Sequence, residues 1–215
     1  MFFETRSAPP FFKNGFVIAC DTTREAVVID PGDEIAELAE IVRRQSLQVR
    51  YILLTHAHVD HVAGVAEAKR LFGCPVGVHR DDMFLYQAAV RQGQTFGYHI
   101  EQPPEPDFFY DPDSPLAFGR HELLIRHTPG HSPGGVCLAV QDPSQPTHLF
   151  VGDTLFAGSI GRTDLPGGDL DTLLRSIRDV LFPFGDDAIV HPGHGPSTTI
   201  GEERRTNPFL TGDRG

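Results

Sequence analysis

The sequence THAHVDH, at residues 55–61, decides the fold and directly follows an apolar run of strand length. His56 and His58 are two residues apart, so in an extended segment their rings point to the same side and can reach one cation. Asp60 and His61 fall where the chain turns toward a helix and can reach a second cation nearby. A solvated polar loop is the alternative, but it does not require four metal-ligating side chains behind a buried strand.

Three later turns carry one candidate ligand each, and glycine accompanies all three. His131 lies in TPGHSPGG (residues 128–135), Asp153 ends the apolar run FVGD, and His194 lies in PGHG. The carboxylate of Asp153 has two oxygens and can therefore bridge two metals. One position remains for a water, as a hydrolytic site requires. The sequence thus predicts three ligands for one metal (His56, His58, His131), three for the other (Asp60, His61, His194) and a bridge (Asp153).

The order of elements along the chain favours an α/β class. Short apolar runs predict strands, and apolar residues at helical spacing predict helices between them. Four of the strands end at Asp30, His56, Asp153 and His194, and sites in α/β structures gather at strand ends. The predicted strands are 16–19, 26–29, 49–54, 75–78, 122–127, 136–140, 148–151 and 188–190. The predicted helices are 35–42, 61–72, 81–90, 170–181 and 201–209.

Length and charge limit the classes of protein. The chain has 215 residues, 40% of them hydrophobic and 22% charged, which favours a single globular domain over residues 1–215. The formal net charge of −11 argues against a nucleic-acid or anionic-membrane binder, which would present a basic face. No apolar stretch is long enough to span a bilayer, and the first residues do not resemble a signal peptide. Three scattered cysteines form no disulfide framework, so we expect a cytoplasmic protein.

Residues 91–115 differ from the rest because they are rich in proline, glycine and aromatic residues. Two interpretations stay open for them. They form a surface loop whose rings pack on the body of the protein, or they form a lid beside the site.

The ligand order resembles that of the metallo-β-lactamase superfamily, in which HxHxDH is followed by His, Asp and His at strand ends. Within it, the chain is similar to the short bacterial branch of the glyoxalase II family, also called hydroxyacylglutathione hydrolases. The segments GDTLF (152–156), GSIGR (158–162) and PGHGP (192–196) carry this likeness, which extends from Asn14 to Leu210. The resemblance implies a four-layer αβ/βα sandwich of two mixed β-sheets flanked by helices.

The ligands and the resemblance together imply a metal-dependent thioester hydrolase. A water shared by two divalent cations loses a proton near neutral pH, because one zinc ion alone lowers its pKa to roughly 7. The hydroxide would attack the carbonyl of a small acyl thioester such as S-lactoylglutathione. Asp60 would orient the nucleophile and accept its proton. We expect two divalent ions, zinc first, although such ligands also accept iron or manganese. Asp30 matches a carboxylate that supports the metal loop in the family, and its alternative role is a helix N-cap.

The substrate is less defined than the reaction. Longer members of the family bind glutathione with a basic residue, two tyrosines and basic residues of an added C-terminal helical domain. Arg162 matches the basic position, although an ion pair with Asp164 is its alternative role. The two tyrosine positions fall near Asp164 and Pro196, and neither tyrosine is present. The chain is also too short for the added domain. A glutathione thioester is therefore expected only from the resemblance to the family. The oligomeric state is not readable from the sequence.

Several other activities compete with this interpretation. The strongest is a persulfide dioxygenase with one iron, which shares the fold and which the stretch GRTD (161–164) resembles. Against it, HGP at 194–196 resembles the hydrolases. A lactonase is a further alternative, because the hydrolysis of an ester and of a thioester needs the same hydroxide. A β-lactamase would be secreted, and a non-catalytic metal-binding protein would not need seven ligands around an open position.

Overall fold

The computed structural model describes residues 1–111, 113–142 and 145–212. Its contacts divide the chain into two compact units. The N-terminal unit comprises Met1–Tyr110 and Ala117–His121, and the C-terminal unit comprises the described residues of Asp111–Leu116 and Glu122–Gly215. Each unit is described by itself below.

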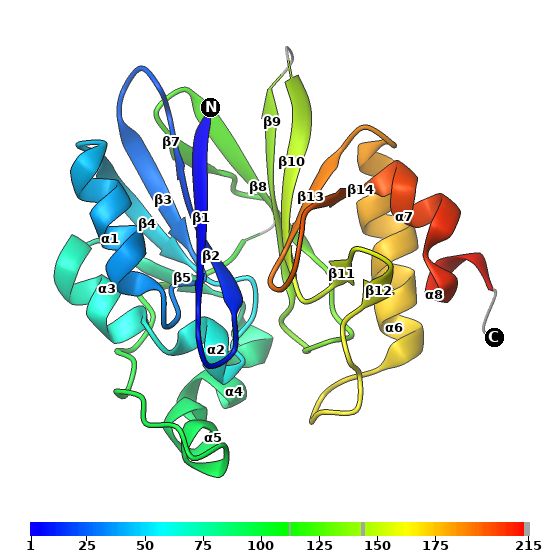
Figure 1. The fold of residues 1–215 in the computed structure, drawn as a ribbon, viewed down its shortest axis with the longest axis horizontal. Coiled ribbons are helices and arrows are strands. Elements are labelled where there is room, and N and C mark those ends of the chain that lie inside the picture. The colour runs from blue at the N-terminus through cyan, green and yellow to red at the C-terminus, as the bar shows by residue number, and fades with distance from the viewer. Residues whose placement is uncertain (112, 143–144, 213–215) are drawn as a thin grey trace. The chain divides into compact units, whose positions relative to one another are not determined.

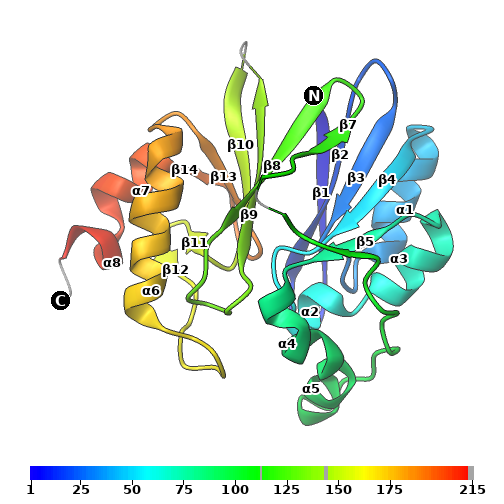
Figure 2. The ribbon, with the colours of Figure 1, turned by 180° about the vertical axis from the view of Figure 1, so that it is seen from behind.

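The N-terminal unit is built on a mixed six-stranded sheet in the order β1-β2-β3-β4-β5-β6. The first three strands pair antiparallel, and β3 to β6 pair parallel. Helices α1 and α3 cover one face of this sheet (Figures 1 and 2). The strands are β1 (Phe2–Ala8), β2 (Lys13–Ala19), β3 (Glu25–Ile29), β4 (Gln48–Leu53), β5 (Val76–Val78) and β6 (Phe108–Phe109). The helices are α1 (Ile35–Arg44), α2 (Val59–Val62), α3 (Val65–Phe72), a 3-10 turn (Arg80–Asp82), α4 (Met83–Gln87) and α5 (Ala89–Thr95).

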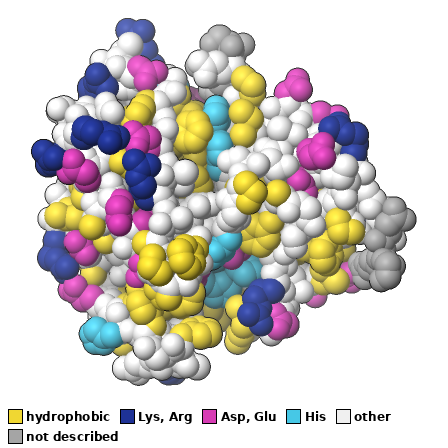
Figure 3. Space-filling view, in the orientation of Figure 1, with side chains coloured by type: hydrophobic (Ala, Val, Ile, Leu, Met, Phe, Trp, Pro, Cys, Tyr) yellow, Lys and Arg dark blue, Asp and Glu magenta, His cyan; other side chains and the backbone are white. Residues whose placement is uncertain are grey.

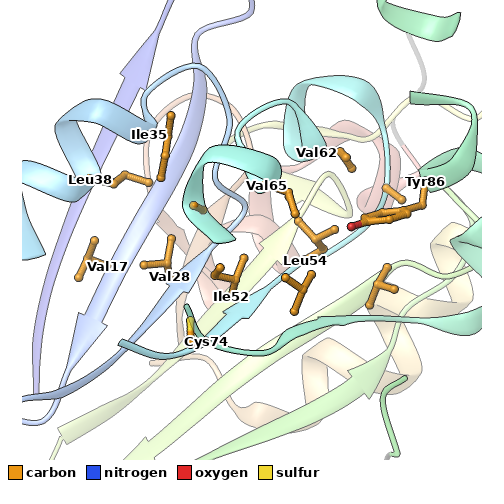
Figure 4. Close-up of a cluster of buried hydrophobic side chains, with 14 of the residues drawn as sticks. Val17, Val28, Ile35, Leu38, Ile52, Leu54, Val62, Val65, Cys74 and Tyr86 are labelled. Atoms are coloured by element: carbon orange, nitrogen blue, oxygen red, sulfur yellow. The ribbon is translucent and has the colours of Figure 1, made fainter. Parts of the chain in front are cut away.

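The core of the N-terminal unit lies between the sheet and these helices, as Figure 4 shows. Val28 and Ile52 lie on neighbouring strands and Leu38 lies on α1, and all three side chains are fully buried in one apolar cluster. Replacing a buried leucine such as Leu38 by alanine lowers the free energy of unfolding by about 2–5 kcal/mol. The packing of this layer therefore contributes strongly to holding α1 on the sheet.

The C-terminal unit contains most of a second mixed six-stranded sheet, in the order β14-β13-β10-β9-β8-β7. The pair β10–β13 is parallel, whereas β9 pairs antiparallel with both β8 and β10. Helices α6 and α7 cover one face, where Leu149, Val190 and Leu173 are fully buried (Figures 1 and 2). The strands are β7 (Leu116–Phe118), β8 (His121–His127), β9 (Val136–Asp142), β10 (Gln145–Gly152), β11 (Leu155–Phe156), β12 (Ser159–Ile160), β13 (Ile189–Pro192) and β14 (Thr198–Thr199). The helices are α6 (Leu170–Arg175), a π-helical turn (Ser176–Leu181), a 3-10 turn (Phe182–Phe184), α7 (Ile200–Thr206) and α8 (Pro208–Thr211).

The predicted fold class, two mixed sheets flanked by helices, is confirmed, and most strands lie where the apolar runs placed them. The sequence patterns missed β1, because its alternating residues are only half buried at one edge of the sheet. The helix predicted over 61–72 is two helices, broken at Gly64, whose Cα packs against the carbonyl oxygen of Gly32. The strand at 49–54 is buried on both faces only at its end.

The segment 91–115 is only partly a loop. It begins inside α5 and contains β6, and residue 112 lies outside the described residues. Tyr110 is buried, and its hydroxyl oxygen lies 2.8 and 2.9 Å from the carbonyl oxygens of Leu54 and Gly77, the two acceptors within reach of its one proton. Tyr98 packs edge-on against Phe11. These rings pack on the N-terminal unit, and the interpretation of the segment as a lid stays a prediction.

Charges of both signs are interspersed on the surface. Figure 3 shows acidic and basic side chains mixed over the helices of the N-terminal unit on this face. Pairs such as Arg43–Glu40 and Arg70–Glu101 account for part of this mixing, with nitrogen–oxygen distances of 2.6 Å in both pairs. Among the described residues, no helix combines the length and the apolar character needed to cross a bilayer.

Candidate metal centre

The N-terminal unit brings its four predicted ligands together directly after β4. His56, His58 and His61 are buried, and the side chain of Asp60 is 14% exposed. The ring centroid of His56 lies 4.9 Å from that of His58 and 4.0 Å from that of His61. Asp60 Oδ2 lies 3.6 Å from His61 Nε2. The rings of His56 and His58 therefore lie close together, and α2 carries the other two predicted ligands.

Asp30 supports this cluster from the end of β3. It is fully buried, and its carboxylate accepts two hydrogen bonds from Thr55, from the backbone N–H and from the hydroxyl, each at 2.6 Å. The same carboxylate approaches His61 Nδ1 to 2.9 Å. A carboxylate at that distance favours the tautomer with the proton on Nδ1, which leaves the lone pair on Nε2 for a metal.

Asp30 does not act as the N-cap of α1. The N-cap residue is Glu34, which makes no side-chain cap bond, so the alternative role considered for Asp30 is wrong. Asp30 itself adopts a left-handed backbone conformation, with φ of 49°. Aspartate tolerates this region better than most residues, and the conformation turns the carboxylate toward Thr55 and His61.

A buried ion pair holds the turn that contains Asp30. Lys13 Nζ lies 2.6 Å from Glu34 Oε1, and both side chains are almost fully buried. Lys13 also donates to the carbonyl oxygen of Asp30, and Glu34 accepts from the backbone N–H of Gly32 at 2.9 Å. Gly32 in turn packs so closely on the carbonyl oxygen of Asp60 that a Cβ would approach that oxygen to 2.4 Å. The ion pair thus fixes the turn on which the ligand loop rests.

Asp82 is a further support that the sequence did not reveal. Its buried carboxylate accepts from the backbone N–H of Ala57 at 2.9 Å, between the two histidines of the HxH pair. The ligand motif is distant in sequence from Lys13, Glu34 and Asp82. No local pattern around these three residues indicates that they are buried. Only the packing of the strands and helices brings them to the loop.

The C-terminal unit brings its three predicted ligands together around one carboxylate oxygen. Asp153 Oδ2 lies 3.7 Å from His131 Nε2 and 3.6 Å from His194 Nε2. His131 donates from Nδ1 to the carbonyl oxygen of Arg162 at 2.8 Å, so its lone pair is on Nε2, the nitrogen that faces Asp153. A carboxylate placed between two imidazoles in this way suits the predicted bridging role.

Glycines allow the close packing behind these ligands. Gly130 precedes His131 with φ of 129°, and a Cβ there would approach the backbone nitrogen of Leu173 to 2.3 Å. A Cβ on Gly161 would approach the carbonyl oxygen of Asp153 to 1.8 Å. Neither position admits a side chain, so packing requires glycine at both 130 and 161.

The residues of each unit fit divalent metal ions. The donors are imidazole nitrogens and carboxylate oxygens, the ligand types that zinc and iron accept. Asp30 lies at Nδ1 of His61 and the carbonyl oxygen of Arg162 lies at Nδ1 of His131, so Nε2 of each ring is left as the donor to a metal. Within the N-terminal unit, donor atoms of His56 and His58, and those of Asp60 and His61, lie within 4.8 Å of each other.

Comparison with known proteins gives the family. The model of a protein family described as the metallo-β-lactamase superfamily matches residues 8–194. The chain belongs to the metallo-β-lactamase superfamily. The matched segment contains all seven predicted ligands, and members of this superfamily are typically metal-dependent hydrolases.

Similar members of the superfamily extend over almost the whole chain. The hydroxyacylglutathione hydrolase GloC of Haemophilus influenzae is 38% identical over 201 residues, which are 93% of each chain. The crystal structure of the B3 metallo-β-lactamase BLEG-1 is 38% identical with a TM-score of 0.89, and covers 98% of this chain and 100% of that chain. The structure of TTHA1623 in a di-iron-bound form is 40% identical with a TM-score of 0.84, at the same coverage.

Arg162, predicted as a substrate contact, forms an ion pair in the structure. Its Nε and Nη2 donate to the two carboxylate oxygens of Asp164 at 2.7 and 2.8 Å, and both side chains are exposed. The hydrogen bonds from Arg162 lower the pKa of Asp164 to about 2. The ion pair considered as an alternative therefore exists, and it leaves Nη1 of Arg162 for another anion.

Proposed function

We propose that the protein is a metal-dependent thioester hydrolase, similar to hydroxyacylglutathione hydrolases. The observation that carries the metal-dependent part is the position of Asp153 Oδ2 between the Nε2 atoms of His131 and His194. The thioester part is supported by GloC, the relative that bears the name hydroxyacylglutathione hydrolase.

Both ligand sets serve one dinuclear centre in this proposal. The order of the motifs and the family match over residues 8–194 support it. His56, His58 and His131 would hold one cation, and Asp60, His61 and His194 would hold the other, with Asp153 shared between the two. The di-iron form of TTHA1623 supports two ions, and it makes iron the metal to test beside zinc.

The cations supply Lewis acidity and a bound water that ionises near neutral pH. The protein's residues hold and orient the reacting groups. Asp60, 14% exposed, orients the nucleophile and accepts its proton, while Asp30 keeps the proton of His61 on Nδ1. A thiolate is a good leaving group, so the reaction does not depend on a strong general acid, and none is assigned.

A substrate panel with the metal-loaded protein tests the proposed activity. We expect S-lactoylglutathione to be hydrolysed with a higher kcat/KM than a lactone or a cephalosporin. The cephalosporin is included because BLEG-1 is described as a metallo-β-lactamase. A higher kcat/KM on the cephalosporin would replace the thioester proposal by β-lactam hydrolysis, and oxygen uptake with glutathione persulfide would replace it by persulfide oxidation.

Arg162 is proposed to contact a carboxylate of the substrate through Nη1. Replacing Arg162 by alanine is expected to raise KM for S-lactoylglutathione roughly 2–5-fold with kcat nearly unchanged. An exposed charge contact contributes at most about 1 kcal/mol, and its loss affects ground state and transition state equally. Steady-state kinetics measure the effect. Asp164→Ala is the matched control, because it frees the guanidinium and should leave KM unchanged or lower it. An unchanged KM in Arg162→Ala would reduce Arg162 to a partner of Asp164.

A further inference from the structure

Three polar side chains form a hydrogen-bonded row in the C-terminal unit, and none of them is a predicted metal ligand. His191 Nδ1 lies 2.9 Å from Ser197 Oγ, and His191 Nε2 lies 2.9 Å from His148 Nδ1. His191 therefore uses both ring nitrogens in hydrogen bonds to two different segments of the chain.

The ring of His191 has a fixed position and charge. It is 2% exposed and lies nearly parallel to the rings of His148 and Phe150, with centroid distances of 5.2 and 4.9 Å. Burial first, and the charge of His148 second, lower the pKa of His191 to about 4. The ring is thus neutral at physiological pH, and it can bond on both sides without bringing a buried charge.

This row closes the loop that presents His194. The loop connects β13 to β14, and Val190 pairs with Thr198 at its base. The bond between His191 and Ser197 joins the two ends of the loop just above that pair, and His194 lies midway between them in sequence.

The loop is also tied to the turn that contains Asp153. The backbone N–H of Gly193 donates to the carbonyl oxygen of Gly152 at 2.8 Å. Phe150, which stacks on His191, lies on the strand that leads into Asp153, and it is the register partner of His191. Through these contacts His191 lies between the strand that leads into Asp153 and the loop that contains His194, whose side chains are 3.6 Å apart.

We infer that His191 is a positioning residue for His194, and that its hydrogen bond to Ser197 holds the His194 loop in the shape that binds metal. The inference rests on the metal centre proposed above. Because His194 is 32% exposed, fewer packing contacts restrain it than restrain the buried histidines, and the loop closure supplies the missing restraint.

Two similar substitutions separate the two bonds of His191. The amide of asparagine reaches about as far as Nδ1 of the imidazole, so His191→Asn can keep the bond to Ser197 while losing the bond to His148. The amide of glutamine reaches about as far as Nε2, so His191→Gln keeps the bond to His148 and loses the one to Ser197. Each variant loses the ring that stacks on Phe150, so a role in packing alone predicts similar effects.

The readout is the affinity for Co²⁺, measured on metal-free protein by competition with a chromophoric chelator and by the visible spectrum of the bound cobalt. We expect His191→Asn to stay within about threefold of the unchanged protein. His191→Gln and Ser197→Ala should each lose roughly 10–100-fold, the usual effect of removing an outer partner of a metal ligand. Ser197→Ala should add little in the His191→Gln background, because both changes break the same bond.

Equal losses of Co²⁺ affinity in His191→Asn and His191→Gln would overturn the inference, as would unchanged affinity in Ser197→Ala. Thermal unfolding identifies a variant that fails to fold, and then Ser197→Ala and Ser197→Thr decide, since only threonine keeps the hydroxyl. The result does not depend on the substrate. If the unchanged protein binds Co²⁺ but hydrolyses no thioester, only the proposed activity fails. If it binds no Co²⁺, the metal centre itself fails.

Discussion

Replacing Asp153 by alanine is expected to abolish metal binding and hydrolysis together. The carboxylate lies between the Nε2 atoms of His131 and His194, at 3.7 and 3.6 Å, so its loss removes the negative charge that keeps two cations close to each other. We expect kcat/KM to fall on the order of 10³-fold or more, equivalent to about 4 kcal/mol of transition-state stabilisation. Elemental analysis and thioester hydrolysis on the same preparation measure both effects.

The control for this variant is Asp164→Ala, which makes the same chemical change at an exposed position. It should keep full metal content and kcat. Asp153→Ala should also keep its thermal unfolding temperature in the absence of metal, because the side chain is a ligand and not part of the apolar core. Full activity in Asp153→Ala would show that the proposed centre is misplaced.

The second large effect is expected for Asp30→Asn. Asparagine has the same size and tolerates the left-handed backbone at this position, so the turn is preserved. The amide can still accept from Thr55, but it no longer places a negative charge 2.9 Å from His61 Nδ1. The proton of His61 then moves to Nε2 in part of the molecules, which removes the lone pair that the metal needs.

We expect Asp30→Asn to lower metal affinity roughly 10–100-fold, with a parallel loss of activity at limiting metal. Competition with a chelator measures the affinity, and excess metal should restore most of the rate. Asp33→Asn is the matched control, because Asp33 lies in the same turn and, in the described part of the chain, forms no hydrogen bond or ion pair with Thr55 or His61. An Asp30→Asn variant with unchanged affinity would reduce Asp30 to a support of the backbone.

The sequence indicated the proposed ligands, but most of the residues that support them emerged only from the structure. His56, His58 and His61 share a short motif after an apolar strand, so local geometry alone brings them together. Asp153 and His194 were predictable because β10 and β13 are parallel neighbours whose ends lie at one edge of the sheet. The family comparison confirms the fold class and the superfamily that these motifs indicated.

The supports depend on tertiary packing that no local pattern encodes. Lys13 is nearly fully buried, although lysine is rarely buried, and only its pairing with Glu34 makes the position tolerable. Asp82 reaches Ala57 from a different part of the chain. His191 contacts Ser197 and His148, which are distant in sequence from one another, so these bonds became visible only once β10, β13 and β14 were placed.

The seven proposed ligands are expected to form a two-metal centre that hydrolyses thioesters. The most direct test adds Zn²⁺ or Fe²⁺ stepwise to metal-free protein while S-lactoylglutathione hydrolysis is followed. We expect activity to rise until two equivalents of metal are bound per chain, and we expect no such rise for Asp153→Ala. Saturation at one iron per chain, with oxygen consumed on glutathione persulfide and no thioester hydrolysis, would contradict it.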